Sequence, residues 1–319
     1  MGVRQIMERS FICKCLTAVY EEKQFVLRGP VHIQFDIGKE QLFHVDIEQG
    51  VIRSIKISTD SDVSIFSLNA ILSKIERLLM LLDGKFIRLK EMKFSESDMF
   101  KDDLLIPCAQ DLIAQRLSYF CSADFCKNAL YRLIDFENIF TTDLFNKWDD
   151  LLDELGVVHQ MFLYLVSDSK ITIDVKCAFL VELAEPIVEV VKERTYYFAS
   201  LEPGSRGTTL KNCLDVLITK YGEEIFNKEL SSKQYNQFLN ALVNSRVNIM
   251  HVKRNQRKPA LNGEQSSLYA QKLSLLYRKI LFELLEIDDS LYLEKLKHCV
   301  SSLDNWNSIS DHFLNLLSK

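Results

Sequence analysis

The apolar side chains change their spacing for good near Pro107, and this change constrains the fold more than any other feature of the sequence. Residues 25–58 alternate apolar and polar side chains between turn signals such as RGP and EQG, which is typical of strands. From Pro107 onward, apolar residues recur every three to four positions, which is typical of helices. The pattern predicts an α+β fold with a strand-rich first part and a helical remainder.

The strand-rich part also contains one amphipathic helix. Apolar residues follow helical spacing from Leu68 to Leu82, and Gly84 stands where a helix-capping glycine is common. The segment KFIRLKEMKF then alternates again, so we expect a small sheet with one helix packed on it. The acidic, serine-containing SESDMFKDD is typical of a linker. We therefore predict a β-rich domain in residues 1–103 and a helical domain in residues 104–319.

The helical domain is predicted to be a bundle. We expect the loop at 202–209 and the segment after His251 to be its main irregular parts. The predicted helices are 108–122, 124–140, 142–168, 172–199, 208–221, 231–250 and 266–286, with a short tail helix near 289–299.

Charge and composition exclude several classes of protein. Because the net charge is −5, a site for a polyanion has to be a local basic patch. The longest apolar runs are far shorter than the ~18 residues that span a bilayer, and no secretory pattern opens the chain, so we expect a cytoplasmic protein. The pairs Cys13/Cys15 and Cys121/Cys126 fall in different predicted elements without nearby His, which favours structural thiols over a zinc site. We expect no metal and no other cofactor.

The helix that ends near Met250 carries the strongest functional signal. Ser231 and Gln234 fit a capping box that would start this helix. Arg246 stands in the middle of its apolar stripe, where a guanidinium needs a carboxylate or a phosphate because burying an unpaired ion is costly. His251 lies about 140° around from Arg246, so the two converge only if the helix ends near Met250 or if two copies meet across a dimer axis. The stripe consists of Tyr235, Phe238, Leu239, Leu242, Val243, Ile249 and Met250.

A basic run follows His251. It consists of Lys253, Arg254, Arg257 and Lys258. No Asp or Glu occurs from Leu230 to Gly263, where the average of the chain would give about five. The run is typical of a site for a polyanion, although an Arg and a His at this range of spacing are expected about once by chance.

The surroundings of Arg246 resemble a known family. The stretch VNSRVNIMH, followed by a basic loop and the long helix SSLYAQKLSLLYRKILFELLEI, is similar to the C-terminal signature of HEPN domains. It is most similar to the ApeA-type HEPN proteins of bacterial anti-phage defence, and the first part of the chain with KIERLLMLLDGK is similar to their N-terminal domain. The resemblance implies a metal-independent ribonuclease that acts as a dimer.

The resemblance also implies roles for individual residues. Arg246 and His251 match the catalytic Arg and His of the family. The polar residue that usually follows the Arg is replaced by Val247, and Asn248 stands one place later as the candidate for its role.

The acidic partner of Arg246 has two candidates. The helix ITIDVKCAFLVELAEPIVEVVKE resembles an earlier long helix of the family that carries a Glu, which leaves Glu182 or Glu185. The same carboxylates allow a structural interpretation, in which Arg246 pairs with one of them as a tie within the bundle. His251 would then complete carbonyls at a helix end, and the basic run would be a solvated loop.

The chemistry of RNA cleavage fits these residue types. The 2′-hydroxyl attacks its own 3′ phosphate when a base removes its proton, an acid protonates the leaving 5′ oxygen, and a cation offsets the charge on the phosphorane. Two His251 side chains across a dimer would supply base and acid, Arg246 would clamp the phosphate bidentately, and the basic run would hold the RNA backbone.

We therefore expect an endoribonuclease of an abortive anti-phage defence system, homodimeric through its helical domain. Its N-terminal domain would sense a trigger or restrain the nuclease, and the expected partners besides RNA are a phage-derived trigger or a companion regulatory protein. The alternative is a non-catalytic helical interaction protein, in which Arg246 is structural and the basic run binds a partner.

Overall fold

The computed structural model of the chain has two compact units, Met1–Asp149 and Asp150–Lys319. The predicted α+β class is confirmed, with a small antiparallel sheet in the first unit and a helical bundle in the second. The predicted boundary between residues 103 and 104 lies outside the described residues and stays a prediction. The described residues are 12–20, 31–36, 42–49, 53–83, 89–95, 132–134, 139–167, 171–194, 209–251, 258–305 and 308–318.

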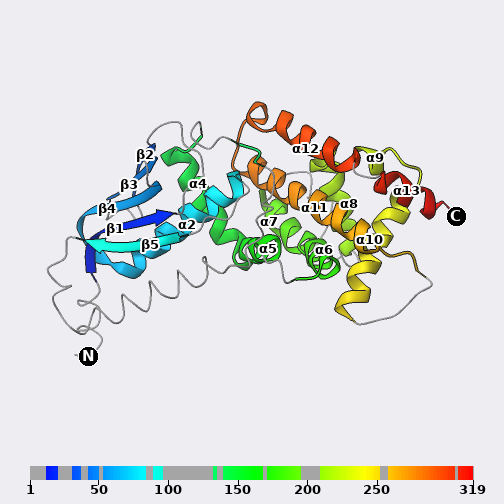
Figure 1. Cartoon of the computed structure of the whole chain (residues 1–319), viewed down its shortest axis with the longest axis horizontal. Coiled ribbons are helices and arrows are strands. Elements are labelled where there is room, and N and C mark those ends of the chain that lie inside the picture. Colours follow the sequence, from blue (N-terminus) through cyan, green and yellow to red (C-terminus); the bar gives the residue numbers. More distant parts are fainter. Residues whose placement is uncertain are drawn as a thin grey trace. The chain divides into compact units, whose positions relative to one another are not determined.

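The first unit contains a five-stranded sheet in the order β2-β3-β4-β1-β5, in which all neighbours are antiparallel (Figure 1). The predicted alternation is confirmed, since Val45 and Ile47 of β3 and Ile55 and Ile57 of β4 are buried. The strands are β1 (Ile12–Tyr20), β2 (Val31–Asp36), β3 (Leu42–Gln49), β4 (Arg53–Ser64) and β5 (Leu89–Ser95).

Strand β1 is an addition to the predicted strands. Its register against β4 shifts between Cys13 and Cys15, and the neighbours Cys15 and Leu16 are both buried. An irregularity of this kind breaks the period of two, which is why alternation did not single out this strand.

Helix α2 (Ile65–Asp83) packs against β1 and β4, as the amphipathic pattern predicts. Its buried carboxylate, Glu76, accepts a hydrogen bond of 2.8 Å from the Tyr20 hydroxyl of β1. The Trp148 indole donates to the Lys74 carbonyl oxygen at 2.8 Å, so the middle of α4 (Thr142–Leu155) is fixed to α2.

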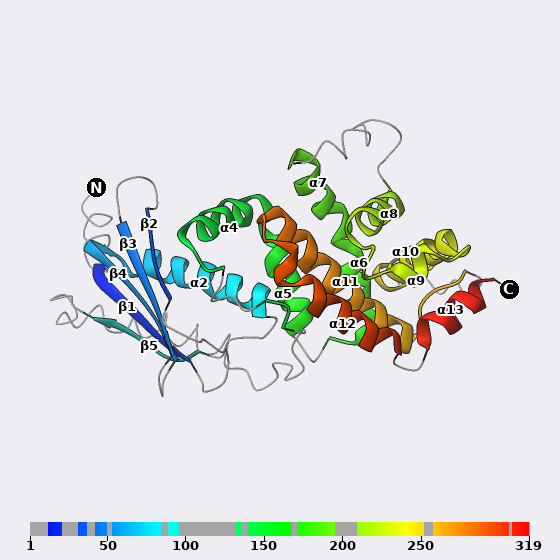
Figure 2. The same ribbon diagram turned by 90° about the horizontal axis from the view of Figure 1, so that it is seen from above.

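The second unit is built around α11 (Gly263–Leu284), which lies between α6 and α12 in both views (Figures 1 and 2). Most of its residues are buried, including the cationic Lys272 and Arg278. The other helices of the unit are α5 (Val157–Ser167), α6 (Ile173–Glu182), α7 (Ala184–Arg194), α8 (Leu210–Tyr221), α9 (Asn227–Leu230), α10 (Tyr235–Met250), the short 3-10 helix η4 (Asp289–Leu291), α12 (Leu293–Asn305) and α13 (Ile309–Leu317).

Two predicted long helices are each divided. The helix predicted at 142–168 is two helices, separated by Gly156 in the left-handed conformation (φ +50°), which glycine adopts without strain. The helix predicted at 172–199 is interrupted after Glu182. Pro186 has no N–H to donate to the Glu182 carbonyl, and the proline ring clashes with that carbonyl.

The remaining helix predictions differ from the structure mainly at their ends. The helices predicted at 208–221 and 266–286 are confirmed as α8 and α11, and the tail helix is η4 with α12. Helix α13 was not predicted. The helix predicted at 108–122 lies outside the described residues, and the described residues of 124–140 are not helical.

The predicted capping box of α10 was wrong. Ser231 instead closes the short helix α9, and Gln234 occupies the N-cap of α10 without a side-chain hydrogen bond. The hydroxyl that accepts from the Gln234 N–H, at 3.0 Å, belongs to Ser232. The hydrogen bond between the Gln234 N–H and the Ser232 hydroxyl thus takes the place of the predicted capping box.

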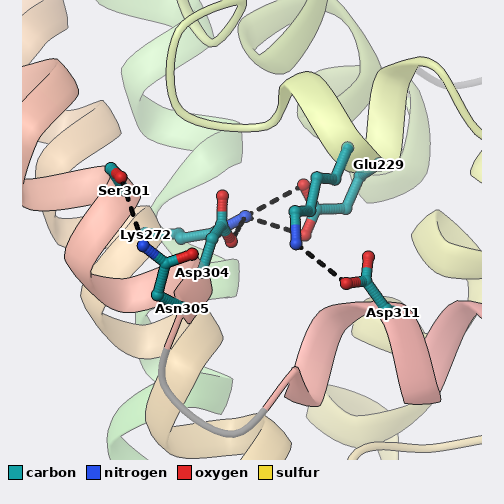
Figure 3. Close-up of polar contacts among 7 residues, drawn as sticks. Glu229, Lys272, Ser301, Asp304, Asn305 and Asp311 are labelled. Atoms are coloured by element: carbon teal, nitrogen blue, oxygen red, sulfur yellow. Dashed lines mark hydrogen bonds and ion pairs between the residues drawn. The ribbon is translucent and has the colours of Figure 1, made fainter.

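A buried charge cluster, consisting of Lys272, Glu229 and Asp304, ties α11 to α9 and α12 (Figure 3). The Lys272 ammonium donates to both Glu229 oxygens at 2.9 and 3.0 Å and lies 2.8 Å from Asp304 Oδ1. The side chains of Lys272 and Glu229 are 0% exposed and that of Asp304 is 14% exposed. At the adjacent surface, Lys228 of α9 pairs with Asp311 of α13 at 2.9 Å.

Candidate functional site

Glu182, Arg246 and His251 lie together where α6 and α10 end, and we call them the site cluster. Helix α6 packs against α10, which brings its last residue, Glu182, to Arg246. A carboxylate is disfavoured at the C-terminal end of a helix, where the helix dipole is negative. A cation beside Glu182 therefore stabilises the end of α6.

Arg246 and Glu182 form a two-point ion pair. Arg246 Nη2 donates to Glu182 Oε1 at 2.6 Å, and Arg246 Nε donates to Glu182 Oε2. This hydrogen-bonded pair, together with the charges of Glu182 and Glu185, raises the pKa of the Arg246 guanidinium against the opposing effect of burial. Two of the five guanidinium N–H donors serve Glu182. Of the other three, one on Nη1 and one on Nη2 form the Nη1/Nη2 edge, and the second on Nη1 points toward the Cδ side.

His251 reaches the open edge of the guanidinium. Helix α10 ends at Met250, and the His251 N–H donates to the Val247 carbonyl at 3.1 Å as the C-cap. His251 Nε2 lies 3.4 Å from Arg246 Nη1, which is long for a hydrogen bond. Arg246 and His251 of a single chain therefore converge because the helix ends at Met250, which is the first of the two arrangements predicted from the sequence.

The cluster is partly open to solvent. The side chains of Arg246 and Glu182 are 20% and 29% exposed, and His251 is exposed. Phe238 and Leu242 of the predicted apolar stripe are buried, but Met250 is 38% exposed. The predicted buried face of α10 is fully buried only up to Leu242. Val243, Arg246 and Ile249 are half-buried, because the last turns of α10 extend past the neighbouring helices (Figure 1).

The other predicted site residues occupy different places. Glu185 is exposed in the first turn of α7, and it acts on Arg246 only through its charge. Asn248 lies about 200° around α10 from Arg246 but within roughly 60° of His251, so it shares the face of His251. Asn248 is half-buried.

The basic run is described only at its end. Lys258 is exposed, whereas Lys253, Arg254 and Arg257 lie outside the described residues. Nothing in the structure therefore tests the placement of these three cations.

Two polar residues that the sequence reasoning missed fix the chain where it returns after the basic run. Asn244 Nδ2 donates to the Pro259 carbonyl at 2.9 Å. The Ser245 hydroxyl donates to the Ala241 carbonyl at 2.8 Å and accepts from the Leu261 N–H at 2.7 Å. The sequence did contain a sign of these contacts. Asn and Ser are disfavoured inside a helix unless their side chains form hydrogen bonds, and both stand inside the predicted helix.

Four cysteines, Cys15, Cys177, Cys213 and Cys299, are free and buried, as predicted for small core residues. Burial, with a smaller effect of Asp174, raises the pKa of the Cys177 thiol to about 12. Burial and the charges of Glu185 and Glu189 raise the pKa of the Cys213 thiol to about 11. Among the described residues, no group of three or more His, Cys, Asp or Glu side chains is arranged to hold a metal ion.

The site cluster lies within a stretch that matches the model of a known protein family. The model of the Apea-like HEPN family matches residues 177–291, a stretch that contains the whole site cluster. No curated protein and no solved structure matches the chain. Within the described part of the chain, no helix has the length and apolar character needed to cross a membrane.

Proposed function

Because residues 177–291 form an Apea-like HEPN domain, we propose that this protein is a metal-independent endoribonuclease of an abortive anti-phage defence system. At the level of the family, the domain supports nuclease activity and a role in defence. The observation that carries the proposal is the site cluster, in which a cation and an imidazole meet at a partly exposed helix end.

Arg246 binds the scissile phosphate through its open edge. Glu182 occupies the Nε side of the guanidinium, so the phosphate cannot take the Nε–Nη2 fork. The two parallel donors of the Nη1/Nη2 edge, beside His251, offer a second fork to the non-bridging oxygens. As the attack proceeds, these donors offset the charge that develops on the phosphorane.

His251 transfers protons. One imidazole accepts the proton of the 2′-hydroxyl as the O2′–P bond forms, and a second donates a proton to O5′ as the P–O5′ bond breaks. The products are a 2′,3′-cyclic phosphate and a 5′-hydroxyl end. Since one chain offers one His251, the proposed active form is a homodimer that joins two site clusters. The need for a 2′-hydroxyl makes the site specific for RNA over DNA.

The remaining predicted residues hold the substrate. Asn248 contacts the RNA on the side of His251, and Lys253, Arg254, Arg257 and Lys258 neutralise backbone phosphates. Residues 1–103 sense a trigger or restrain the nuclease, and a phage-derived trigger or a companion regulatory protein is the partner that switches it on.

The Arg246–Glu182 pair also fits the alternative, a non-catalytic interaction protein in which the pair is a structural tie. The exposure of His251 beside the pair favours the nuclease, because a structural tie has no need of an imidazole at its open edge.

The decisive experiment incubates the purified protein with end-labelled RNA in EDTA, and compares the wild type with His251→Ala. We expect the wild type to cut and to leave cyclic phosphate ends, and the variant to be at least about 100-fold slower, the usual effect of losing a general acid or base. A wild type that leaves RNA intact at high concentration, with and without phage extract, supports the interaction protein instead.

A further inference from the structure

The chain leaves α10 at His251 and returns to the same helix at a fixed place. The Asn244 side chain holds the Pro259 carbonyl, and the Ser245 hydroxyl holds the Leu261 N–H. Lys258, the last cation of the basic run, directly precedes Pro259 and is exposed. Its backbone is therefore held one residue away from a hydrogen bond to α10.

The return point is also fixed on its far side. Asn262 follows Leu261 and caps α11, accepting from the Gln265 N–H at 3.0 Å. The Gln265 side chain accepts from the Asn262 N–H, also at 3.0 Å, which completes a capping box. Two hydrogen bonds to α10 and one capping box thus hold the residues from Pro259 to Gln265.

The place where the chain returns lies on the same face of α10 as His251. Asn244 and His251 are seven residues apart, which separates them by about 20° around the helix and roughly 10 Å along it. The Asn244 end of this face holds the chain beside Lys258, and the other end carries the imidazole beside the open edge of Arg246. The site cluster and Lys258 are thus joined by one rigid helix.

We propose that Lys258 is a subsite for an RNA backbone phosphate next to the scissile one, and that Ser245 and Asn244 are the positioning residues that hold it at a fixed distance from His251. This inference rests on the proposed nuclease function. A cation whose backbone is already fixed loses less conformational freedom when it binds, so its phosphate contact contributes more to affinity. Lysine suits this role as a compact point charge.

The test is a double-mutant cycle of Ser245→Ala and Lys258→Ala, read by the affinity for a short RNA with 2′-O-methyl ribose throughout, which cannot be cut. We expect Lys258→Ala to weaken binding about tenfold near physiological salt and to lower the salt slope of log Kd by about 1. Ser245→Ala should weaken binding by several-fold, and the double variant should bind little more weakly than Lys258→Ala alone, because the two residues act together.

Two further variants serve as controls. Ser245→Thr retains the hydroxyl and should bind as tightly as the wild type. Lys297→Ala removes another exposed lysine, on α12, and should leave both affinity and salt slope unchanged.

A kinetic readout separates positioning from general structural damage. On a dinucleoside monophosphate, which has only the scissile phosphate, Ser245→Ala should keep the wild-type kcat, whereas on a longer RNA its KM should rise. Effects of Ser245→Ala and Lys258→Ala that simply multiply would overturn the proposal, as would an equal loss of kcat on both substrates. If the wild type binds the methylated RNA but cuts no RNA, the nuclease function is refuted, and the double-mutant cycle still decides whether Lys258 is a phosphate subsite. If the wild type does not bind RNA, the nuclease function and the subsite are both refuted.

Discussion

Two groups of paired cations and carboxylates in the helical unit, the buried charge cluster and the site cluster, differ in their access to water. In the buried charge cluster, Lys272 and Glu229 are sealed from solvent, and Lys272 also contacts Asp304. In the site cluster, Arg246 has one carboxylate partner, is partly exposed, and keeps an open edge beside His251. The same kind of interaction therefore holds helices in one place and leaves donors free for a ligand in the other.

The difference follows from where the helices end. Lys272 lies in the middle of α11, with α9 and α12 close on either side, so its ammonium contacts carboxylates from both (Figure 3). Arg246 lies just over one turn from the end of α10, beyond the last buried residue of that helix. Burial strengthens the attraction between the two charges and raises the cost of removing one of them, whereas exposure to solvent lowers both.

The largest expected effect is on the stability of the buried charge cluster. Lys272→Ala leaves Glu229 as a buried, uncompensated carboxylate, so we expect it to lower the free energy of unfolding by about 3–5 kcal/mol in urea denaturation. The matched control is Lys228→Ala, which breaks the nearby surface pair with Asp311 and should change stability by less than about 1 kcal/mol.

The double variant Lys272→Met/Glu229→Gln removes the charges of the two sealed residues, so it should recover part of the stability that Lys272→Ala loses. Equal effects of Lys272→Ala and Lys228→Ala would contradict the distinction between sealed and open pairs.

The next prediction concerns Arg246, where we expect a large effect on activity and a small effect on stability. Arg246→Ala should lower kcat for RNA cleavage about 100- to 1000-fold, because the developing charge loses its donors. The same variant should change the free energy of unfolding by about 1 kcal/mol or less, since its ion pair is partly solvated. Parallel rate and urea measurements on one preparation test both parts. A large loss of stability with unchanged cleavage would make Arg246 a structural residue.

The smallest effect distinguishes the two carboxylates near Arg246. Glu182→Gln keeps the shape of the side chain but weakens a charge-assisted contact by about 1.5 kcal/mol, so we expect cleavage to slow about tenfold as the guanidinium loses its fixed orientation. Glu185→Gln serves as the control and should have little effect, because Glu185 is exposed and makes no described hydrogen bond to Arg246. The reverse order of the two rates would refute the assignment of Glu182 as the orienting carboxylate.

Much of this arrangement could be predicted from periodicity and from the cost of burying charge. The change of spacing near Pro107 separated the sheet from the bundle, and the position of Arg246 predicted a carboxylate or a phosphate as its partner. The family resemblance then supplied Glu182 and Glu185 as the candidates. The choice between Glu182 and Glu185 depended on the end of α6, which Pro186 sets; the proline is visible in the sequence, but the helix was predicted to continue through it.

Other features of the site depend on packing that no local pattern records. The apolar stripe of α10 predicted burial up to Met250, yet burial stops at Leu242 because it depends on the length of the neighbouring helices. The hydrogen bonds of Asn244 and Ser245 join α10 to residues about fifteen positions later, across a segment whose path periodicity does not predict.

The break at Pro186 has a consequence for judging related sequences. Pro186 ends α6 at Glu182, and the carboxylate that meets Arg246 therefore stands at a helix end beside the partly exposed cluster. On the proposed nuclease function, the arginine and the histidine alone therefore do not define the site, and an imino acid four positions after the glutamate marks a chain in which that carboxylate stands at the end of its helix.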